Sequence, residues 1–211
     1  MGFLKKVVFL DRDGTINVDS ADYIKSRSEF EFIPGSIEAV QDLTDNGFIS
    51  IVITNQSALA RKFISPEELD AMHAMMCREI ASGGGKITDT FFCPHMPHAG
   101  CECRKPAPGL INQARQKYNI NLADSIMVGD SAKDIACGRN AGCGKTVLVK
   151  SGKDPNVEKE LKKRSISADF VAGNLLEAAE WIIAKKDFKK ANRRIMNIEI
   201  RRKDSLRSIF L

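Results

Sequence analysis

Short apolar runs alternate with longer polar segments along the first 185 residues. The runs are rich in Val, Ile and Phe and stop at glycine or at polar clusters, which is typical of strands buried on both faces. They predict six strands, at residues 7–10, 48–53, 88–92, 125–128, 145–149 and 169–171. Proline, serine and asparagine start signals between them predict helices at residues 36–47, 66–81, 108–118 and 131–141, and a last helix from Asn174 onward.

This alternation predicts the fold class. Strand–helix–strand units with right-handed crossovers make a parallel sheet covered by helices on both faces. We therefore expect a three-layer, Rossmann-like α/β domain over residues 1–184 and a separate tail over residues 185–211. A chain of 211 residues suits one such domain and is short for two.

Polar side chains follow several of the predicted strands. They are Asp11 and Asp13 after the first strand, Thr54 after the second, Lys105 in the loop after the third and Asp130 after the fourth. The carboxyl ends of parallel strands meet at one edge of a sheet, where ligands bind. We therefore expect these side chains, from stretches more than a hundred residues apart, to form one functional site.

The set has the chemistry of phosphoryl transfer, which needs positioning and charge neutralisation. Asp11 is suited to attack phosphorus and form an aspartyl phosphate, and Asp13 to protonate the leaving group and then activate water. Asp11, the carbonyl of Asp13 and Asp130 offer hard oxygen ligands for Mg²⁺. Thr54 and Lys105 would stabilise the charge of the phosphoryl group. A Mg²⁺-dependent phosphomonoesterase is therefore predicted.

Two motifs suggest other sites and are set aside. The Asp11-x-Asp13-Gly motif also opens a Ca²⁺-binding EF-hand loop, but the preceding segment is strand-like and position twelve is Asp22 instead of Glu. The segment 144–146, Gly-Lys-Thr, resembles the end of a P-loop, but it precedes a strand where a P-loop precedes a helix.

Some candidate residues also have simpler interpretations. Lys105 could simply be solvated, since a lone lysine is most often exposed. Asp134 is either an acid beside the metal ligands or the N3 residue of a capping box with Ser131. Asn55 and Ser57 would serve equally well to cap a turn.

The motifs resemble those of the haloacid dehalogenase (HAD) superfamily of phosphatases. The resemblance covers residues 4 to about 150 and rests on Asp11-x-Asp13-Gly-Thr, Thr54-Asn55-Gln56, Lys105 and Gly129-Asp130-x-x-x-Asp134. It implies the HAD fold and the roles given above. The spacing between the motifs leaves no room for a large cap domain, so an open site is expected.

A second cluster of metal-binding residue types lies just before Lys105, in residues 93–103. Three thiols and one imidazole suit a tetrahedral zinc site, formed by Cys93, His95, Cys101 and Cys103. Free thiols are the alternative, and His98 competes with His95 as the fourth ligand. Such a structural zinc site would stiffen the loop and hold Arg104 and Lys105 at the rim of the phosphate pocket.

This zinc loop resembles that of a small capless branch of the superfamily, which acts on heptose 1,7-bisphosphate or on histidinol phosphate. The heptose-specific members are the more similar ones at segments 17–19, 30–33 and 54–57. This resemblance implies removal of the 7-phosphate in lipopolysaccharide precursor synthesis. Histidinol phosphate is the alternative substrate. The branch's usual Gly-Tyr is replaced by residues 20–23, and its Lys after the fourth-motif Asp is Ser131. The resemblance implies substrate contacts by Asp19, Ser20, Ala21, Asp22, Thr54, Asn55, Gln56, Ser57, Arg104 and Lys105.

Charge and composition bound the partners. The formal net charge is +5, but residues 185–211 hold ten Lys/Arg against three Asp/Glu, so the remainder is slightly acidic and no nucleic-acid partner is expected. Neither a membrane span nor a signal peptide is evident, which predicts a cytoplasmic location. The family resemblance implies a phosphorylated sugar as substrate, and a monomer is expected. Two other classes of protein are alternatives: a non-catalytic phosphate or nucleic-acid binder, and a receiver-like signalling domain. Asp13 and the zinc loop argue against the receiver-like domain.

Overall fold

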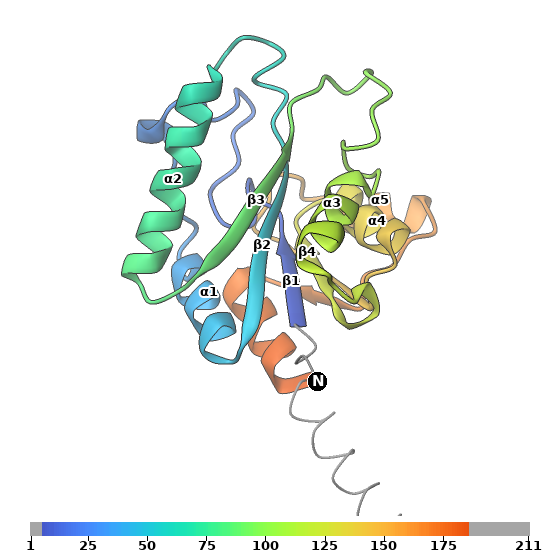
Figure 1. Ribbon diagram of the computed structural model, residues 1–211. Helices are drawn as coiled ribbons and strands as arrows, with labels where there is room; N and C mark the ends of the chain where they lie inside the picture. Colours follow the sequence, from blue (N-terminus) through green and yellow to red (C-terminus); the bar gives the residue numbers. More distant parts are fainter. Residues whose placement is uncertain (1–5, 186–211) are drawn as a thin grey trace, which may run out of the picture. The chain divides into compact units, whose positions relative to one another are not determined.

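The computed structural model describes residues 6–185, in which six strands form a parallel sheet (Figure 1). Neighbouring strands follow the order β3-β2-β1-β4-β5-β6, and every neighbouring pair is parallel. The strands are β1 (Lys6–Leu10), β2 (Phe48–Asn55), β3 (Ile87–Cys93), β4 (Ile126–Gly129), β5 (Lys145–Val149) and β6 (Phe170–Ala172). All six predicted strands are present, with boundaries within two residues of those expected.

Helices cover both faces of this sheet. Figure 1 shows α1 and α2 on one face and α3, α4 and α5 on the other. Their bounds are α1 (Ser36–Asp45), α2 (Pro66–Ser82), α3 (Gly109–Tyr118), α4 (Ala132–Ala141) and α5 (Val157–Lys163). Residues 175–185 are also helical, and the side chain of Asn174 accepts a hydrogen bond from Glu177 N at 3.0 Å, as an N-cap does. The three-layer α/β fold is therefore confirmed.

Strand β1 lies in the middle of the sheet and is buried on both faces. Val7, Val8, Phe9 and Leu10 are each at most 1% exposed. The ladder continues for one residue beyond the strand, because Asp11 N donates to Val128 O of β4 at 2.9 Å. The apolar run thus fixes the backbone of Asp11 at the carboxyl edge of the sheet, beside the end of β4.

Helix α5 and two short 3₁₀ helices, Arg27–Glu29 and Leu122–Asp124, are absent from the prediction. In α5 only Val157 and Leu161 are buried, within a run of charged residues. Two apolar positions four residues apart are too few to distinguish a short helix from a polar loop. The helix forms because both side chains pack in the cluster with Ile135 and Leu148.

The chain divides into two compact units, Met1–Ala179 and Glu180–Leu211. The predicted division after residue 184 stays a prediction, because residues 186–211 of the basic tail lie outside the described residues. Within residues 6–185, no helix has both the length and the apolar character needed to cross a membrane. The connections after β1, β2 and β3 cover residues 11–35, 56–65 and 94–108, which is too short for a folded cap.

A mild truncation tests the packing of the central strands. Ile51 of β2 is fully buried, so Ile51→Val should lower the free energy of unfolding by about 1 kcal/mol. Urea unfolding followed by circular dichroism measures the change. The matched control is Val18→Ala, whose side chain is 42% exposed and which should change stability by about 0.5 kcal/mol or less. Equal effects of the two substitutions would contradict the described core.

Candidate active site

Lys105 is a buried ammonium that lies between two carboxylates. It is 3% exposed, and its Nζ is 2.7 Å from Asp11 Oδ1 and 2.5 Å from Asp134 Oδ1. It also donates to Ile53 O at 2.9 Å. Burial alone would lower the pKa of Lys105, but the two carboxylates outweigh burial and raise it above its ordinary value. Lys105 is therefore a permanent positive charge inside the site.

The alternative of a solvated Lys105 is excluded by this burial, and the expected position at the rim is wrong. Asn55 explains the difference. Its Oδ1 accepts from Lys105 N at 3.1 Å, and its Nδ2 donates to Lys105 O at 3.3 Å. Because both backbone groups of Lys105 are held at the end of β2, the side chain turns inward. Asn55 thus supports the site through the backbone of the lysine loop.

Asp134 has the capping role that the sequence offered, and it also lies beside Asp11 and Asp130. Its Oδ2 accepts from Ser131 N at 3.0 Å and from Ser131 Oγ at 2.5 Å, so it belongs to the capping box of α4. Its other oxygen, Oδ1, pairs with Lys105. The start of α4 is therefore fixed to the buried lysine.

Asp11, Asp130 and Asp134 form a group that is able to hold a metal ion. One carboxylate oxygen from each lies within 4.8 Å of the others. Burial is the main cause, and repulsion from Asp134 the second, of the raised pKa values of Asp11 and Asp130, which are about 7 and about 8. Three carboxylates against one ammonium leave an excess of two negative charges, and hard oxygen ligands suit Mg²⁺. The residues present therefore fit the predicted ion.

Two glycines from distant parts of the chain lie against the carboxylate of Asp130. A Cβ added to Gly14 or to Gly152 would overlap Asp130 Oδ2. Gly14 also has φ +80°, which side-chain-bearing residues rarely adopt. Gly14 belongs to the recognised Asp-x-Asp-Gly motif, whereas Gly152 follows β5 with no signal in the sequence.

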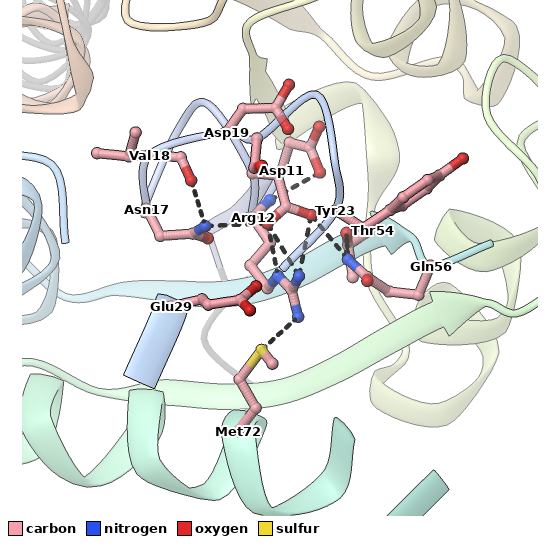
Figure 2. Close-up of polar contacts among 12 residues, drawn as sticks. Asp11, Arg12, Asn17, Val18, Asp19, Tyr23, Glu29, Thr54, Gln56 and Met72 are labelled. Carbon is pink, nitrogen blue, oxygen red and sulfur yellow. Dashed lines mark hydrogen bonds and ion pairs between the residues drawn. The ribbon is translucent and has the colours of Figure 1, made fainter. Parts of the chain in front are cut away.

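Asp13 is held by a different set of partners from Asp11, and Figure 2 labels three of these partners, Arg12, Asn17 and Gln56. Arg12 contacts both of its carboxylate oxygens, with the shortest distance 2.9 Å from Nη2 to Oδ1. Asn17 Nδ2 donates to Oδ1 at 2.9 Å, and Gln56 Nε2 donates to Oδ2 at 2.8 Å and to Thr54 Oγ1 at 2.9 Å. Burial would raise the pKa of Asp13, but Arg12 and these hydrogen bonds hold it below its ordinary value.

Sequence analysis missed Arg12 and Asn17 as residues of the site. Arg12 occupies the variable position between two recognised acids, where an exposed side chain is the simplest expectation. Asn17 was noted only as part of segment 17–19. The available signal was a buried strand end with two acids and only one expected cation, because strand-end carboxylates of this kind need positive partners.

The predicted zinc ligands lie together in the loop after β3. Cys93, His95, Cys101 and Cys103 are grouped, with His95 Nδ1 3.2 Å from Cys103 Sγ and the sulfur atoms 3.1–3.6 Å apart. His98 is exposed and is not in the group. A donor set of three sulfurs and one nitrogen converging on a point suits tetrahedral zinc.

The residues predicted to contact substrate occupy the loops after β1, β2 and β3. Asp19 pairs with Lys153 at 2.7 Å, and Lys153 also donates to Ser20 O at 3.2 Å. Ala21 and Asp22 help to line a pocket of about 430 Å³ with Tyr23, Lys25 and Phe63. Arg104 donates to His95 O at 3.1 Å, so it is attached to the cysteine loop. Thr54, Gln56 and Ser57 are buried at the end of β2.

Comparison with known proteins agrees with this geometry. Residues 102–178 match the HAD-hydrolase-like family model. The D-glycero-beta-D-manno-heptose-1,7-bisphosphate 7-phosphatase of Pseudomonas aeruginosa is 44% identical over 71% of this chain and 83% of its own length. That of Yersinia pestis is 37% identical over 84% and 95%. The Bordetella bronchiseptica D,D-heptose 1,7-bisphosphate phosphatase, solved with magnesium and phosphate, matches with TM-score 0.79 and 37% identity, covering 85% of this chain and 99% of its own.

A parallel α/β sheet with an Asp-x-Asp strand end and a buried lysine between acids defines a HAD-like phosphatase, and the predicted superfamily is confirmed. The chain belongs, within it, to the family of the heptose-1,7-bisphosphate 7-phosphatases.

Metal binding should depend on pH. Without metal, the raised pKa values mean that the folded protein binds protons to Asp11 and Asp130 more tightly than the unfolded chain does, so the free energy of unfolding should fall as the pH rises from about 4 to about 8. Mg²⁺ competes with those protons. At one fixed Mg²⁺ concentration, about 100 times its Kd at pH 8, the ion should add about 2.7 kcal/mol at pH 8 and less at pH 6, where protons compete for the carboxylates, so the rise in Tm should be larger at pH 8. Asp130→Asn should lose most of this increment; an increment independent of pH would argue against the carboxylate group.

Zinc content tests the cysteine loop. Purified protein should contain one zinc per chain by elemental analysis, and Cys103→Ser should lose most of it and lower Tm, because one of four ligands is gone. The matched control is Cys77→Ser, since Cys77 is a half-buried cysteine of α2 outside the group. Full zinc retention by Cys103→Ser would show that the loop is held by other means.

Proposed function

We propose that this protein is a Mg²⁺-dependent phosphatase that removes the 7-phosphate of D-glycero-β-D-manno-heptose 1,7-bisphosphate through an aspartyl-phosphate intermediate. The main observation behind this proposal is the carboxylate of Asp11, which is fixed at the end of β1 and paired with buried Lys105. The relatives of this chain are named as phosphatases with that activity. The rest of the proposal assigns the steps to residues.

Asp11 acts as the nucleophile. Its Oδ1 is held by Lys105 Nζ at 2.7 Å and by Arg12 N at 2.7 Å. Both contacts are made to the same oxygen, so we assign Oδ2 as the atom that attacks phosphorus. Lys105 keeps the carboxylate oriented and offsets the charge of the incoming phosphoryl group. Hydrolysis of the resulting acyl phosphate restores the carboxylate.

Asp13 acts as acid and then as base. The phosphate dianion that binds beside it favours the protonated carboxyl, which can give its proton to the leaving alcohol oxygen. Once the alcohol leaves, the carboxylate can take a proton from the attacking water. Thr54, whose Oγ1 accepts from Gln56, lies at the end of β2 to bind the phosphoryl oxygens.

Mg²⁺, held by Asp11, Asp130 and the carbonyl of Asp13, would neutralise the phosphoryl charge and orient it for in-line attack. Asp134 is part of this region through Lys105. The zinc ion proposed for the cysteine loop has a structural role, because its four protein ligands leave no open position. It would hold Arg104, which is hydrogen-bonded within that loop.

The sugar would bind in front of these groups, at the loops that follow the strands. The pocket of about 430 Å³ contains two of the predicted contact residues, Ala21 and Asp22, and has Lys25 on its lining. A second phosphate on the substrate gives Arg104 a role, since a guanidinium binds phosphate in a bidentate manner. A heptose bisphosphate has a second phosphate for Arg104 to bind. Histidinol phosphate has only one phosphate and carries a cationic amine, so it lacks such a group. The proposal includes a monomeric enzyme in the cytoplasm.

Replacing the nucleophile tests the mechanism. Asp11→Asn should reduce kcat by at least about 10³-fold, because the amide is a poor nucleophile, while far-UV circular dichroism stays unchanged. Phosphate release from the heptose bisphosphate is the assay. Asp45→Asn, an exposed acid at the end of α1, is the matched control and should keep full activity. Substantial turnover by Asp11→Asn would remove the nucleophile assignment.

Substrate and class can be tested in one assay series. The ratio of kcat/KM for heptose 1,7-bisphosphate to that for histidinol phosphate should exceed about 10², since an interaction between a guanidinium and a phosphate contributes a few kcal/mol. EDTA should abolish release and added Mg²⁺ should restore it. Activity that survives EDTA, or a preference for histidinol phosphate, would count against the proposal. A non-catalytic binder would release no phosphate and would show salt-sensitive binding to RNA or phosphate ligands instead.

A further inference from the structure

Arg12 is the most deeply buried cation next to the chemistry, and the mechanism above does not use its side chain. It is 1% exposed, although it follows a strand that ends at the site. On one side its guanidinium contacts the carboxylate of Asp13 through Nε at 3.1 Å and through Nη2 at 2.9 and 3.1 Å. A buried guanidinium is costly unless all of its surroundings are adapted to it.

The other side of the guanidinium is held by helix α2. Nη1 donates to Met72 Sδ at 3.4 Å and lies 3.2 Å from His73 Nε2 (Figure 2 shows the contact with Met72). Burial lowers the pKa of His73 to about 4, so the ring is neutral, and the Nδ1–H tautomer leaves Nε2 as an acceptor for the guanidinium. The ring of Phe30 lies 5.9 Å from the guanidinium carbon, within the range of a cation–π contact.

Asp13 is therefore connected to α2 through a single side chain. The helix begins with Ser65, whose hydroxyl accepts from Glu68 N at 3.2 Å, and Met72 and His73 lie in its second and third turns. Asn17 and Gln56 each add one donor to the same carboxylate. A group that must give a proton to one oxygen and take it from another has to keep its position through both steps, since small displacements reduce rate steeply.

We propose that Arg12, supported by His73, is a positioning residue that holds Asp13 in the orientation needed for proton transfer to the leaving group. This inference rests on the proposed function, because it concerns the acid of that reaction. A bidentate guanidinium fixes both carboxylate oxygens, whereas a lysine ammonium would supply the same charge at one point. Geometry and charge can therefore be separated by substitution.

The leaving group provides the decisive readout. A sugar alkoxide needs a proton to depart, whereas p-nitrophenolate departs with little help. Because kcat/KM reports the steps up to phosphoenzyme formation, a misplaced acid should lower kcat/KM for the sugar phosphate far more than for the aryl phosphate. A residue that only supports folding would lower both by the same factor.

The experiment measures kcat/KM of Arg12→Lys for heptose 1,7-bisphosphate and for p-nitrophenyl phosphate in saturating Mg²⁺. We expect a loss of about 10²-fold on the sugar substrate and less than about tenfold on the aryl substrate, within the range of general acid catalysis. Asp13→Asn provides the reference pattern. The matched control is Arg164→Lys, an exposed arginine paired with Glu160, which should change neither value. Equal losses on both substrates would overturn the inference.

A second pair of variants covers the case in which Arg12→Lys does not fold. His73→Gln keeps an acceptor for Arg12 and should stay close to the wild type, whereas His73→Leu removes it and should show the selective loss on the sugar substrate. Identical behaviour of the two His73 variants would also overturn the inference. If the wild type released phosphate from neither compound, or if Asp13→Asn lost both activities equally, the proposed function or its acid would fail first and the inference with it.

Discussion

The site depends on how the negative charges of its buried and half-buried acids are balanced. Lys105 lies between Asp11 and Asp134, and Arg12 pairs with Asp13, so each of the two acids proposed to react, Asp11 and Asp13, contacts a buried cation. The two pairs have opposite consequences. Arg12 meets the charge of Asp13 fully, whereas Lys105 is shared, and the acids around it keep an excess that matches a divalent ion. In the proposed mechanism, the acid Asp13 therefore has a cation of its own, whereas the nucleophile Asp11 shares Lys105 with Asp134.

Much of the fold was predictable from the sequence, because most strands are short apolar runs that stop at glycine or at polar residues. Parallel pairing then brings Asp11, Thr54 and Asp130 to one edge without further information. Helix α5 was missed since only two of its residues are buried. Gly152 was missed for a different reason: its importance lies in a close approach to Asp130, a contact between distant segments that no local pattern encodes.

Candidate site residues were predictable where the chemistry required their type, and unpredictable where their role is to hold another residue. Lys105 was predictable from its charge, but its burial depends on Asn55, which lies 50 residues earlier in the sequence. Arg12 illustrates the point most fully: its partners are one residue away on one side and about sixty on the other. Supporting contacts of this kind arise from the packing of loops and helices, so they become visible only in three dimensions.

The strand order also bears on how the chain folds. Asp11 follows β1, Asp130 follows β4 and Lys105 comes from the connection after β3, yet the three meet only when β2, β1 and β4 are paired. Contacts between such distant segments form late in folding, because the entropic cost of closing the long loops comes before the contacts can stabilise the chain. Nascent or partly folded chains therefore lack the complete binding site. In this topology, the site is complete only when the central strands have paired, so a partly folded chain is expected to be inactive.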